Sequence, residues 1–488
     1  MDSLAVLGYL MSSRSMPPVP LARKSDSTEN KSTLLEELTA AKRQFKILEL
    51  ENECIEVALK KAAFQRPFLG PSRRQLLTKA LSTFRQPPVR KSCLQFHSNT
   101  FKAQFSQQKR FIQSFAAVET TKPIVGHWLY FNAGLVFAIV VVGGLTRLTE
   151  SGLSITEWNV ISGMKPPRSQ QEWIEEFEKY KQFPEYKILN RHMTLEEFKN
   201  IFYWEWSHRM IGRFIGMSFV LPGLYFASRG YMSKRVMKQT FGISCLLGFQ
   251  GFMGWYMVKS GLSEALMKEP GAVPRVSQYR LTAHLATAVA IYGSTIFVAA
   301  DILRQNKIAS GQYPASTAAM LNNPVLKRFR IASHSLGSLI LLTLLSGGLV
   351  AGLDAGLIYN EYPWMGEGIV PPKDELWSDN YVKPNDGGKW RNFFENPTTV
   401  QFDHRTLAET TATLTTALWA YSRGLPLPKN ARIAVNTMMG AVVLQVTLGI
   451  STLIYMVPIE LAAAHQAGAL ALVTSNFWLI HALRRVPL

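Results

Sequence analysis

The sequence predicts an all-α polytopic membrane protein, with eight transmembrane helices arranged as two parallel-repeat four-helix bundles. Three observations predict this fold: eight long apolar segments, basic residues in alternate connecting loops, and a set of motifs that occurs twice. The 488 residues are 47% hydrophobic but only 18% charged, whereas about 25% charge is usual in soluble domains. This composition disfavours an ordinary soluble enzyme.

The three cysteines argue against several kinds of site. Cys54, Cys93 and Cys245 lie far apart in the chain, with no CxxC pair and no spacing typical of zinc ligands. Thiol chemistry, thiolate-bound clusters and disulfide-rich secreted folds are therefore poor interpretations.

A large part of the basic excess lies near the N-terminus. The chain has 53 Lys and Arg against 34 Asp and Glu, and residues 57–118 contain no acidic side chain. A basic, Ser-rich and acid-free segment is typical of mitochondrial transit sequences. The alternative is a disordered basic tail that binds nucleic acid, but apolar spans follow it and no nucleic-acid-binding fold does. Residues 1–56 contain acidic side chains and form an N-terminal extension of uncertain role.

Eight segments are long and apolar enough to cross a membrane, which takes roughly 20 residues. They are too long and too uniformly apolar to be strands. The predicted spans are 128–147, 209–228, 239–258, 281–303, 331–353, 405–422, 433–457 and 463–482.

The loops predict the orientation of these spans. The loops after the second, fourth and sixth spans and the C-terminus are rich in Lys and Arg, and Asp301 is almost their only acid. The long loops 148–205 and 354–403 contain more acidic residues. Because basic loops stay on the side where a protein is made or matured, we expect a multi-pass protein of the mitochondrial inner membrane with both termini in the matrix.

Motifs of the first half recur in the second half. Gly143-Gly144-Leu145, Glu150 and Trp158 recur, at an offset of 347 − 143 = 204, as Gly347-Gly348-Leu349, Asp354 and Tyr362. Three further pairs match: Glu205–Arg209 with Gln401–Arg405, Tyr256–Val258 with Tyr455–Val457, and Ala283-His284 with Ala464-His465. The glycine pairs are interpreted as close helix contacts.

The duplication divides the chain into two four-helix units, 123–303 and 331–483, which a matrix linker, 304–330, joins. An even number of spans returns the chain to its starting side, so both units have the same orientation.

Four of the nine histidines occupy matched positions near one end of their helices: His208, His284, His404 and His465. Two neutral imidazoles on facing helices are what a six-coordinate haem iron needs, so the pattern predicts one haem site in each unit. The alternatives are buried hydrogen-bonding histidines and a zinc site, which would have too few ligands. His334 and His481 lie toward the opposite end and are interpreted as structural.

The residues beside these histidines differ between the halves. Arg209 and Arg405 follow the first histidine of each unit, and each is interpreted either as a partner of haem propionates or as an interfacial arginine. Glu205 stands three residues before His208, where the second half has Gln401. A carboxylate at one site only predicts that the first unit holds a reacting species, with Glu205 as a general base or electrostatic stabiliser. The alternative is an interfacial acid at a helix N-terminus.

The segment from Gly143 to Trp158, GGLTRLTESGLSITEW, resembles the signature of the haem A synthase family in its mitochondrial form. Glu205–Arg209, Gln250–Val258 and the pair His404-Arg405 resemble further motifs of that family. The resemblance covers about residues 123–483 and leaves the first 120 residues out.

The resemblance implies oxidation of a ring methyl of haem O to a formyl group, through an alcohol intermediate, for the biogenesis of cytochrome c oxidase. His404 and His465 would ligate a resident haem b, and His208 and His284 would bracket the haem O substrate, with Glu205 as the catalytic carboxylate. It also implies electrons from a ferredoxin and its reductase, and work beside haem O synthase. The sequence leaves the oligomeric state open, a homo-oligomer included.

Two other functions fit parts of the pattern. A dihaem b-type membrane electron carrier, similar to a quinol oxidoreductase, would use the same four histidines but would need no carboxylate at one site. A repeat-built transporter would place polar groups near the middle of the membrane, whereas here they gather toward one face.

Overall fold

The computed structural model describes residues 121–159, 164–264, 273–382 and 388–486. The predicted transit segment and the N-terminal extension lie outside these ranges. Within them the secondary structure is helical, apart from one isolated bridge between Met365 and Gly368. Each of the eight predicted spans falls on a long helix: α5 (Pro123–Leu148), α8 (Leu195–Ser228), α9 (Lys234–Gly261), α10 (Gln278–Ala309), α12 (Leu326–Leu353), α15 (Pro397–Ser422), α16 (Lys429–Ile454) and α17 (Ile459–Ala482).

Six of these helices are long and apolar enough to cross a membrane: α5, α8, α9, α10, α12 and α16. Helix α15 is less apolar because it is rich in threonine. Several of these hydroxyls donate to the carbonyl four residues earlier, as Thr410 does to Thr406 and Thr415 to Thr411, so their polarity is satisfied within the helix. Helix α17 carries Gln466 and Asn476, whose amides donate to carbonyls of α5 and α12.

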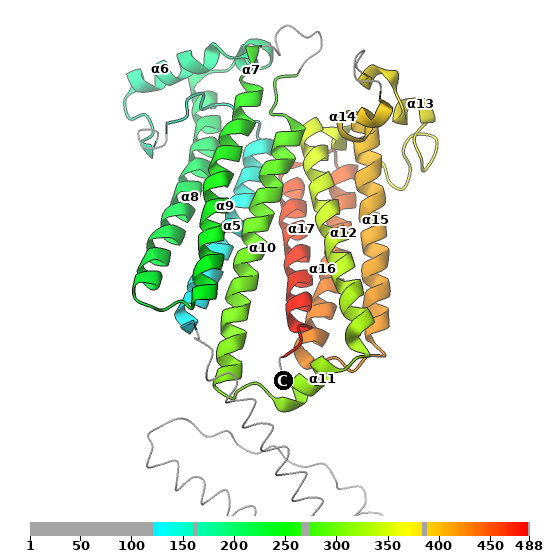
Figure 1. Ribbon diagram of the computed structural model, residues 1–488. Helices are drawn as coiled ribbons and strands as arrows, with labels where there is room; N and C mark the ends of the chain where they lie inside the picture. The colour runs from blue at the N-terminus through cyan, green and yellow to red at the C-terminus, as the bar shows by residue number, and fades with distance from the viewer. Residues whose placement is uncertain (1–120, 160–163, 265–272, 383–387, 487–488) are drawn as a thin grey trace, which may run out of the picture. The chain divides into compact units, whose positions relative to one another are not determined.

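The helices form two groups of four. In the first unit, α5 packs against α8 and α10, and α9 packs against the same two helices. Helices α8 and α10 therefore lie on opposite sides of the unit (Figure 1). In the second unit α12 packs against α15 and α17, and α16 packs against both as well. Each unit has its own apolar core, with Leu129, Phe219 and Ile302 buried in the first, and Phe329 and Met438 in the second.

The two units meet through equivalent helices, since α5 packs against α17 and α10 packs against α12. The second glycine of each repeated pair lies at this contact. A Cβ on Gly144 would overlap Oε1 of Gln466 on α17, and one on Gly348 would lie 3.0 Å from Oγ1 of Thr282 on α10. The glycines therefore allow the close helix contacts that their pairing predicts.

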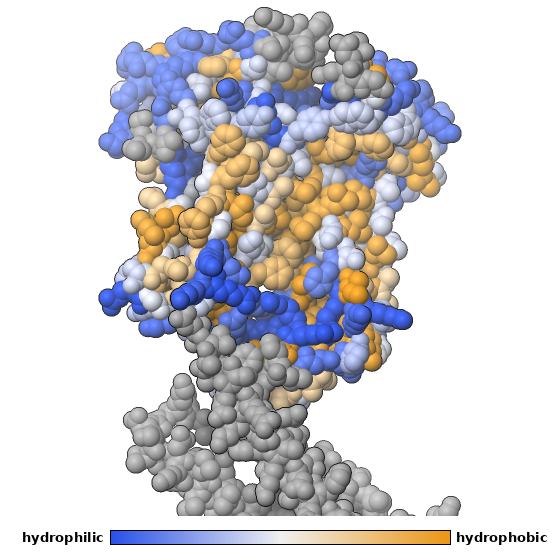
Figure 2. Space-filling model, viewed as in Figure 1, coloured by the Kyte–Doolittle hydropathy of each residue, from blue (hydrophilic) through white to orange (hydrophobic). Residues whose placement is uncertain are grey.

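The two ends of the helices differ in character (Figure 2). An apolar belt lies between two polar ends. The loop end carries the long connections, with the short helices α6 (Gln170–Lys181), α7 (Pro184–Ile188), α13 (Lys373–Leu376) and α14 (Asn392–Glu395). The basic end carries the short connections 229–233 and 423–428, the helix α11 (Ala315–Asn322) and the last described residues.

Every long helix begins before its predicted span, and three of the differences have structural consequences. Helix α8 begins at Leu195 rather than near residue 209, because Thr194 and Glu197 form a capping box and buried aromatic residues attach its first turns to α6. The connection at 304–330 is partly helical, since α10 continues to Ala309 and α12 starts at Leu326.

The third difference is at the end of α16, which stops at Ile454 rather than at 457. Met456 and Val457 adopt left-handed backbone conformations, with φ of 60° and 57°. Their sequence counterparts in the first half, Met257 and Val258, remain inside α9. This repeated tripeptide therefore has two conformations.

Candidate functional site

The four matched histidines lie on α8, α10, α15 and α17, toward the loop end, and each is half-buried. Each ring lies against a glycine of a neighbouring helix in its own unit. A Cβ on Gly143 would lie 3.0 Å from Nε2 of His208, and the equivalent Cβ on Gly347 would lie 3.1 Å from Cε1 of His404. Bulkier residues would displace the rings, so these first glycines of the repeated pairs form cradles for the imidazoles.

The other two histidines have a second, shared arrangement. A Cβ on Gly254 would lie 3.2 Å from Cε1 of His284, and one on Gly449 would lie 2.8 Å from Cε1 of His465. One turn before each glycine is a glutamine whose amide donates to the carbonyl of the same histidine: Gln250 at 3.1 Å and Gln445 at 3.0 Å. The pattern Gln-x-x-x-Gly in both halves is the signal that the sequence analysis missed.

The histidines pair within the units. The first unit holds His208 on α8 and His284 on α10, and the second holds His404 on α15 and His465 on α17. Because α8 and α10 lie on opposite sides of the first unit, as α15 and α17 do in the second, each pair spans the interior of its own bundle.

In the second unit a hydroxyl orients one of the rings. Oγ of Ser346 lies 2.7 Å from Nδ1 of His404 and donates its own proton to the carbonyl of Thr343 at 2.8 Å. A hydroxyl has one proton, so it accepts from Nδ1–H of His404. In this arrangement His404 carries its proton on Nδ1, and its Nε2 lone pair is free.

The first unit lacks this support. Val142 stands where the second half has Ser346, and within the described ranges no hydrogen bond reaches the ring of His208. At His284 the Gln250 amide lies 3.2 Å from Nε2, and the buried Nδ1 has no partner there. The two histidine pairs therefore differ in how firmly their rings are held.

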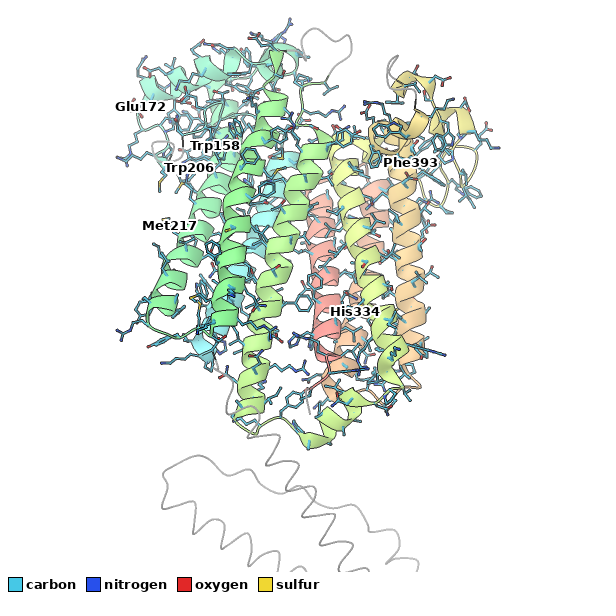
Figure 3. All side chains as sticks on the ribbon, viewed as in Figure 1. Trp158, Glu172, Trp206, Met217, His334 and Phe393 are labelled. Carbon is cyan, nitrogen blue, oxygen red and sulfur yellow. The ribbon has the colours of Figure 1, made fainter. Side chains whose placement is uncertain are left out.

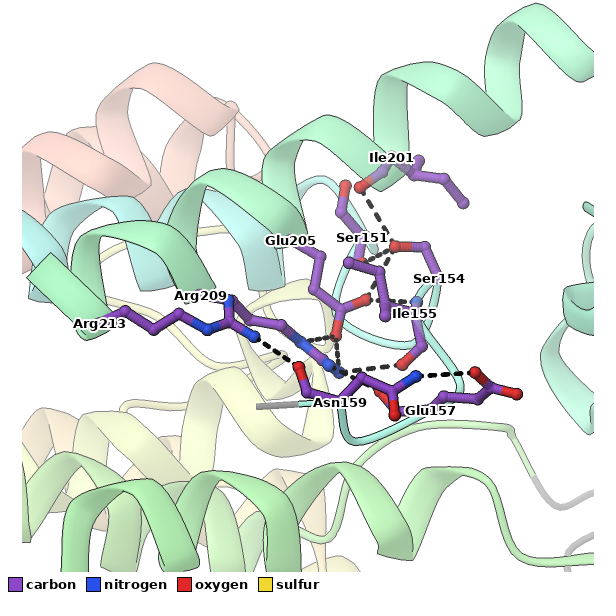
Figure 4. Close-up of polar contacts among 9 residues, drawn as sticks. All are labelled: Ser151, Ser154, Ile155, Glu157, Asn159, Ile201, Glu205, Arg209 and Arg213. Atoms are coloured by element: carbon purple, nitrogen blue, oxygen red, sulfur yellow. Dashed lines mark hydrogen bonds and ion pairs between the residues drawn. The ribbon is translucent and has the colours of Figure 1, made fainter. Parts of the chain in front are cut away.

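Glu205 is buried one turn before His208 and accepts four hydrogen bonds (Figure 4). Its Oε2 accepts from the hydroxyl of Ser154 at 2.8 Å and from the backbone N–H of Ile155 at 2.7 Å. Its Oε1 accepts from Nη2 of Arg209 at 2.7 Å and from Nε at 3.1 Å. Donors surround the carboxylate, which attaches the loop 151–159 to α8.

Gln401 contacts the loop residue that matches Ile155. Its Oε1 accepts from the N–H of Tyr359 at 3.2 Å and its Nε2 donates to the carbonyl of Tyr359 at 2.8 Å. In the first unit Glu205 accepts from the N–H of Ile155, and Arg209 donates to its carbonyl at 2.9 Å. One amide therefore does in the second unit what an ion pair does in the first.

The two arginines also hold loops. Arg209 donates to the carbonyl of Glu157 at 3.0 Å and lies over the Trp158 ring at 5.4 Å. Arg405 donates to the carbonyl of Pro363 and lies over the Tyr362 ring at 4.9 Å. Trp158 and Trp206 both lie at the loop end, far along the bundle from His334 (Figure 3).

Glu185 is a further acid at this end that the sequence did not single out. It lies in α7, is 5% exposed and accepts from the hydroxyl of Tyr180 at 3.0 Å. Burial raises the pKa of Glu185 to about 8, although the Tyr180 hydrogen bond opposes this, and the carboxylates of Glu205 and Glu150 raise it further. No sequence motif marks it, because its burial comes from contacts between α6, α7 and α8.

The donor set fits an iron porphyrin better than a bare metal ion. Within the described ranges no three histidine, cysteine or acidic side chains come together as a metal site. Each unit instead offers two imidazoles, each against a glycine cradle, and the first unit contains the unpartnered Nδ1 of His284. Paired axial imidazoles in a bundle interior are the donors that haem iron takes.

Comparison with known proteins gives a consistent result. A family model described as cytochrome oxidase assembly protein, COX15-CtaA, matches residues 126–477. The chain is 47% identical to the haem A synthase COX15 of Saccharomyces cerevisiae over 80% of each protein. It is 47% identical to the human haem A synthase COX15, over 75% of this chain and 83% of that protein. It is also 47% identical to a haem A synthase–mitochondrial ferredoxin fusion protein of Schizosaccharomyces pombe, over 72% of this chain and 58% of that protein.

Proposed function

Because this chain belongs to the COX15-CtaA family of cytochrome oxidase assembly proteins, we propose that it converts haem O to haem A. The reaction oxidises a ring methyl to a formyl group through an alcohol. The comparisons give no support to the alternative of a b-type electron carrier. The relatives and the apolar helices make this an oxidoreductase of the mitochondrial inner membrane.

All eight long helices cross the membrane in this proposal, as two parallel four-helix units. Support comes from the repeated helix contacts and from the internally satisfied polar groups of α15 and α17. The basic end lies in the matrix, since Lys and Arg gather in its short connections. Both termini then lie in the matrix and the histidines near the opposite face.

The second unit is the site of a resident haem b, with His404 and His465 as its axial ligands. The observation that carries this assignment is the hydrogen bond from Nδ1 of His404 to Ser346, because it presents Nε2 as a ligand before any haem binds. Second-shell bonds of this kind fix the orientation of metal-bound histidines and raise their basicity. When bound, this haem supplies one-electron transfer.

The first unit receives haem O between His208 and His284. Its rings lack an orienting hydroxyl, which suits a group that must enter, react and leave. Glu205 is the carboxylate that serves this site: it lies one turn from His208, and its ion-pair partner Arg209 holds the loop 151–159 against α8. Arg209 and Arg405 follow the first histidine of each unit and are the proposed partners of haem propionates, which would compete with their ion pairs to Glu205 and Glu409.

The electron donor is a ferredoxin with its reductase. The fused ferredoxin of the Schizosaccharomyces pombe relative supports this proposal, and the basic end offers the charge that an acidic partner needs. Haem O synthase would supply the substrate. We propose no nucleic-acid partner.

Two histidine variants test the assignment. His404→Ala should abolish the reduced-minus-oxidised spectrum of the resident haem b in the purified protein. His208→Ala should keep that spectrum, while chromatography of haems extracted from the cells finds haem O and no haem A. Normal haem A in cells that contain only the His208 variant would overturn the assignment of the first unit. A retained haem b spectrum in the His404 variant would overturn that of the second.

A further inference from the structure

An apolar groove of about 700 Å³ lies between the two units, across the middle of the helices. Helices α9, α10, α12 and α17 line it. Small residues on α10 leave the hollow: Ala286, Ala290, Gly293 and Ser294. At its base the Phe477 ring lies against Gly293, where a Cβ would come within 2.7 Å of it.

The lining suits a hydrocarbon chain. Gln239 and Ser294 carry the only polar side chains among the described residues that line this groove. A protein surface that faces lipid has no need of such a hollow, because lipid chains pack equally well on a flat apolar face. A hydrocarbon chain fits this apolar hollow between the units.

The groove continues to a polar end. A second hollow of about 380 Å³ shares Phe297, Leu341 and Phe477 with the first and is also lined by His334, Ser338 and Arg484. His334 is exposed, and its Nδ1 lies 2.7 Å from the carbonyl of Arg330, so its other ring nitrogen is directed away from the helix backbone.

Positive charge predominates at this end. Asp301 is the acid there, and it pairs with Arg484 and with Arg235, whose Nη2 lies 3.4 Å away. Arg304 donates to the carbonyls of Arg484 and Arg485 at the end of α17. Three guanidiniums thus accompany one carboxylate, which leaves a net positive charge beside the second hollow.

We propose that this surface binds an anionic phospholipid of the leaflet at the basic end. One acyl chain fills the groove between α10 and α12, and the phosphate lies beside Arg484 and His334. The apolar hollow and the charge beside it are independent observations, and an anionic phospholipid satisfies both at the depths where they occur. The site is separate from the histidine pairs, so it stands whether or not the haem assignments hold.

The test uses the full chain, purified and reconstituted in nanodiscs that contain phosphatidylcholine and phosphatidylglycerol, followed by native mass spectrometry of the lipids it retains. We expect phosphatidylglycerol to be retained in preference to phosphatidylcholine. Ala290→Phe fills the groove and should abolish retention, whereas Leu224→Phe, at an exposed position on α8 that does not line the groove, should leave it unchanged.

A second pair of variants tests the headgroup. Arg484→Gln should reduce the preference for the anionic lipid roughly fivefold, since one arginine near a membrane surface contributes about that factor. Arg423→Gln removes a guanidinium at the basic end that does not line the groove and is the matched control. Because Arg484 also pairs with Asp301, His334→Ala provides a headgroup variant outside that network, and it should weaken the preference as well.

Three results would overturn the proposal. The first is equal retention of the two lipids by the unaltered protein. The second is unchanged retention in the Ala290 variant. The third is a dimer mass that only the Ala290 variant loses, which would assign the groove to a second copy of the chain.

Discussion

Replacing Ser346 by alanine isolates the contact that distinguishes the two histidine pairs. The variant removes the hydroxyl that accepts from Nδ1 of His404 at 2.7 Å. A neutral hydrogen bond contributes about 1 kcal/mol, and loss of a group that orients a metal-bound histidine lowers metal affinity about 10- to 100-fold. We expect about tenfold weaker binding of haem b in the second unit.

The same change should shift the midpoint potential of that haem. A hydrogen-bonded Nδ1–H makes the imidazole more basic and favours the ferric state, so its loss should raise the potential. If the hydrogen bond stabilises the ferric state over the ferrous state by about 1 kcal/mol, its loss shifts the midpoint potential by roughly 40 mV. A tenfold change in the equilibrium constant of a one-electron couple corresponds to 59 mV.

The assay is titration of haem b into the purified protein, followed by potentiometric measurement of the absorbance spectrum. Ser346→Thr keeps the hydroxyl and should restore both values. Val142→Ser places a hydroxyl at the matching position of the first unit and should leave haem b binding unchanged. If Ser346→Ala binds haem b with unaltered affinity and potential, the hydroxyl does not orient a ligand and the reasoning fails.

Three further predictions concern single side chains. Gly347→Ala should lower haem b content per protein severalfold, as measured by pyridine haemochrome, because its Cβ would lie 3.1 Å from the ring of His404; content equal to that of the unaltered protein would contradict the cradle. Glu205→Gln should leave haem b content unchanged while the extracted pigment remains haem O or the alcohol, and normal haem A would remove Glu205 from the proposed mechanism. For Glu185→Gln, the thermal unfolding midpoint minus that of the unaltered protein should increase as the pH rises from about 5 to 8. The reason is that the pKa of Glu185 is raised to about 8, so the native state binds a proton that the unfolded chain releases above pH 4–5, and its stability falls across that range; a difference independent of pH would refute this.

Much of the site could be predicted from the sequence because the repeat doubles every signal. A single histidine in a helix carries little information, but four at matched positions predict two sites. The offset of 204 also marks Glu150 and Asp354, which both adopt left-handed conformations, with φ of 51° and 54°, at the ends of α5 and α12. The matching sequences give matching turns here because α5 and α12 end in the same way.

The remaining features depend on contacts that no local pattern reveals. The early start of α8 follows from aromatic packing between Phe198 and the residues of α6. The burial of Glu185 likewise requires three elements to assemble. The role of Ser346 depends on its distance from His404 across two helices, and a serine in an apolar segment would otherwise be interpreted as bonding its own backbone.

The difference between Glu205 and Gln401 has a structural component that the sequence comparison alone does not reveal. Both side chains hold the backbone of a matched loop residue, Ile155 or Tyr359. An amide can both donate and accept, so Gln401 meets the N–H and the carbonyl of Tyr359 by itself. A carboxylate can only accept, so Glu205 requires Arg209 for the carbonyl of Ile155.

The ion pair therefore does more than hold a loop, because an amide would be sufficient for that. It places a buried carboxylate one turn from His208, and this carboxylate is paired with the guanidinium that also donates to the loop backbone. A change that draws Arg209 toward another anion would break its bonds to Glu205 and to the carbonyl of Ile155, while Oε2 of Glu205 would keep its bonds to the loop. A permanent site gains nothing from such coupling, whereas a site that must admit and release its occupant does, which is why the charged version in the first unit agrees with a substrate site there.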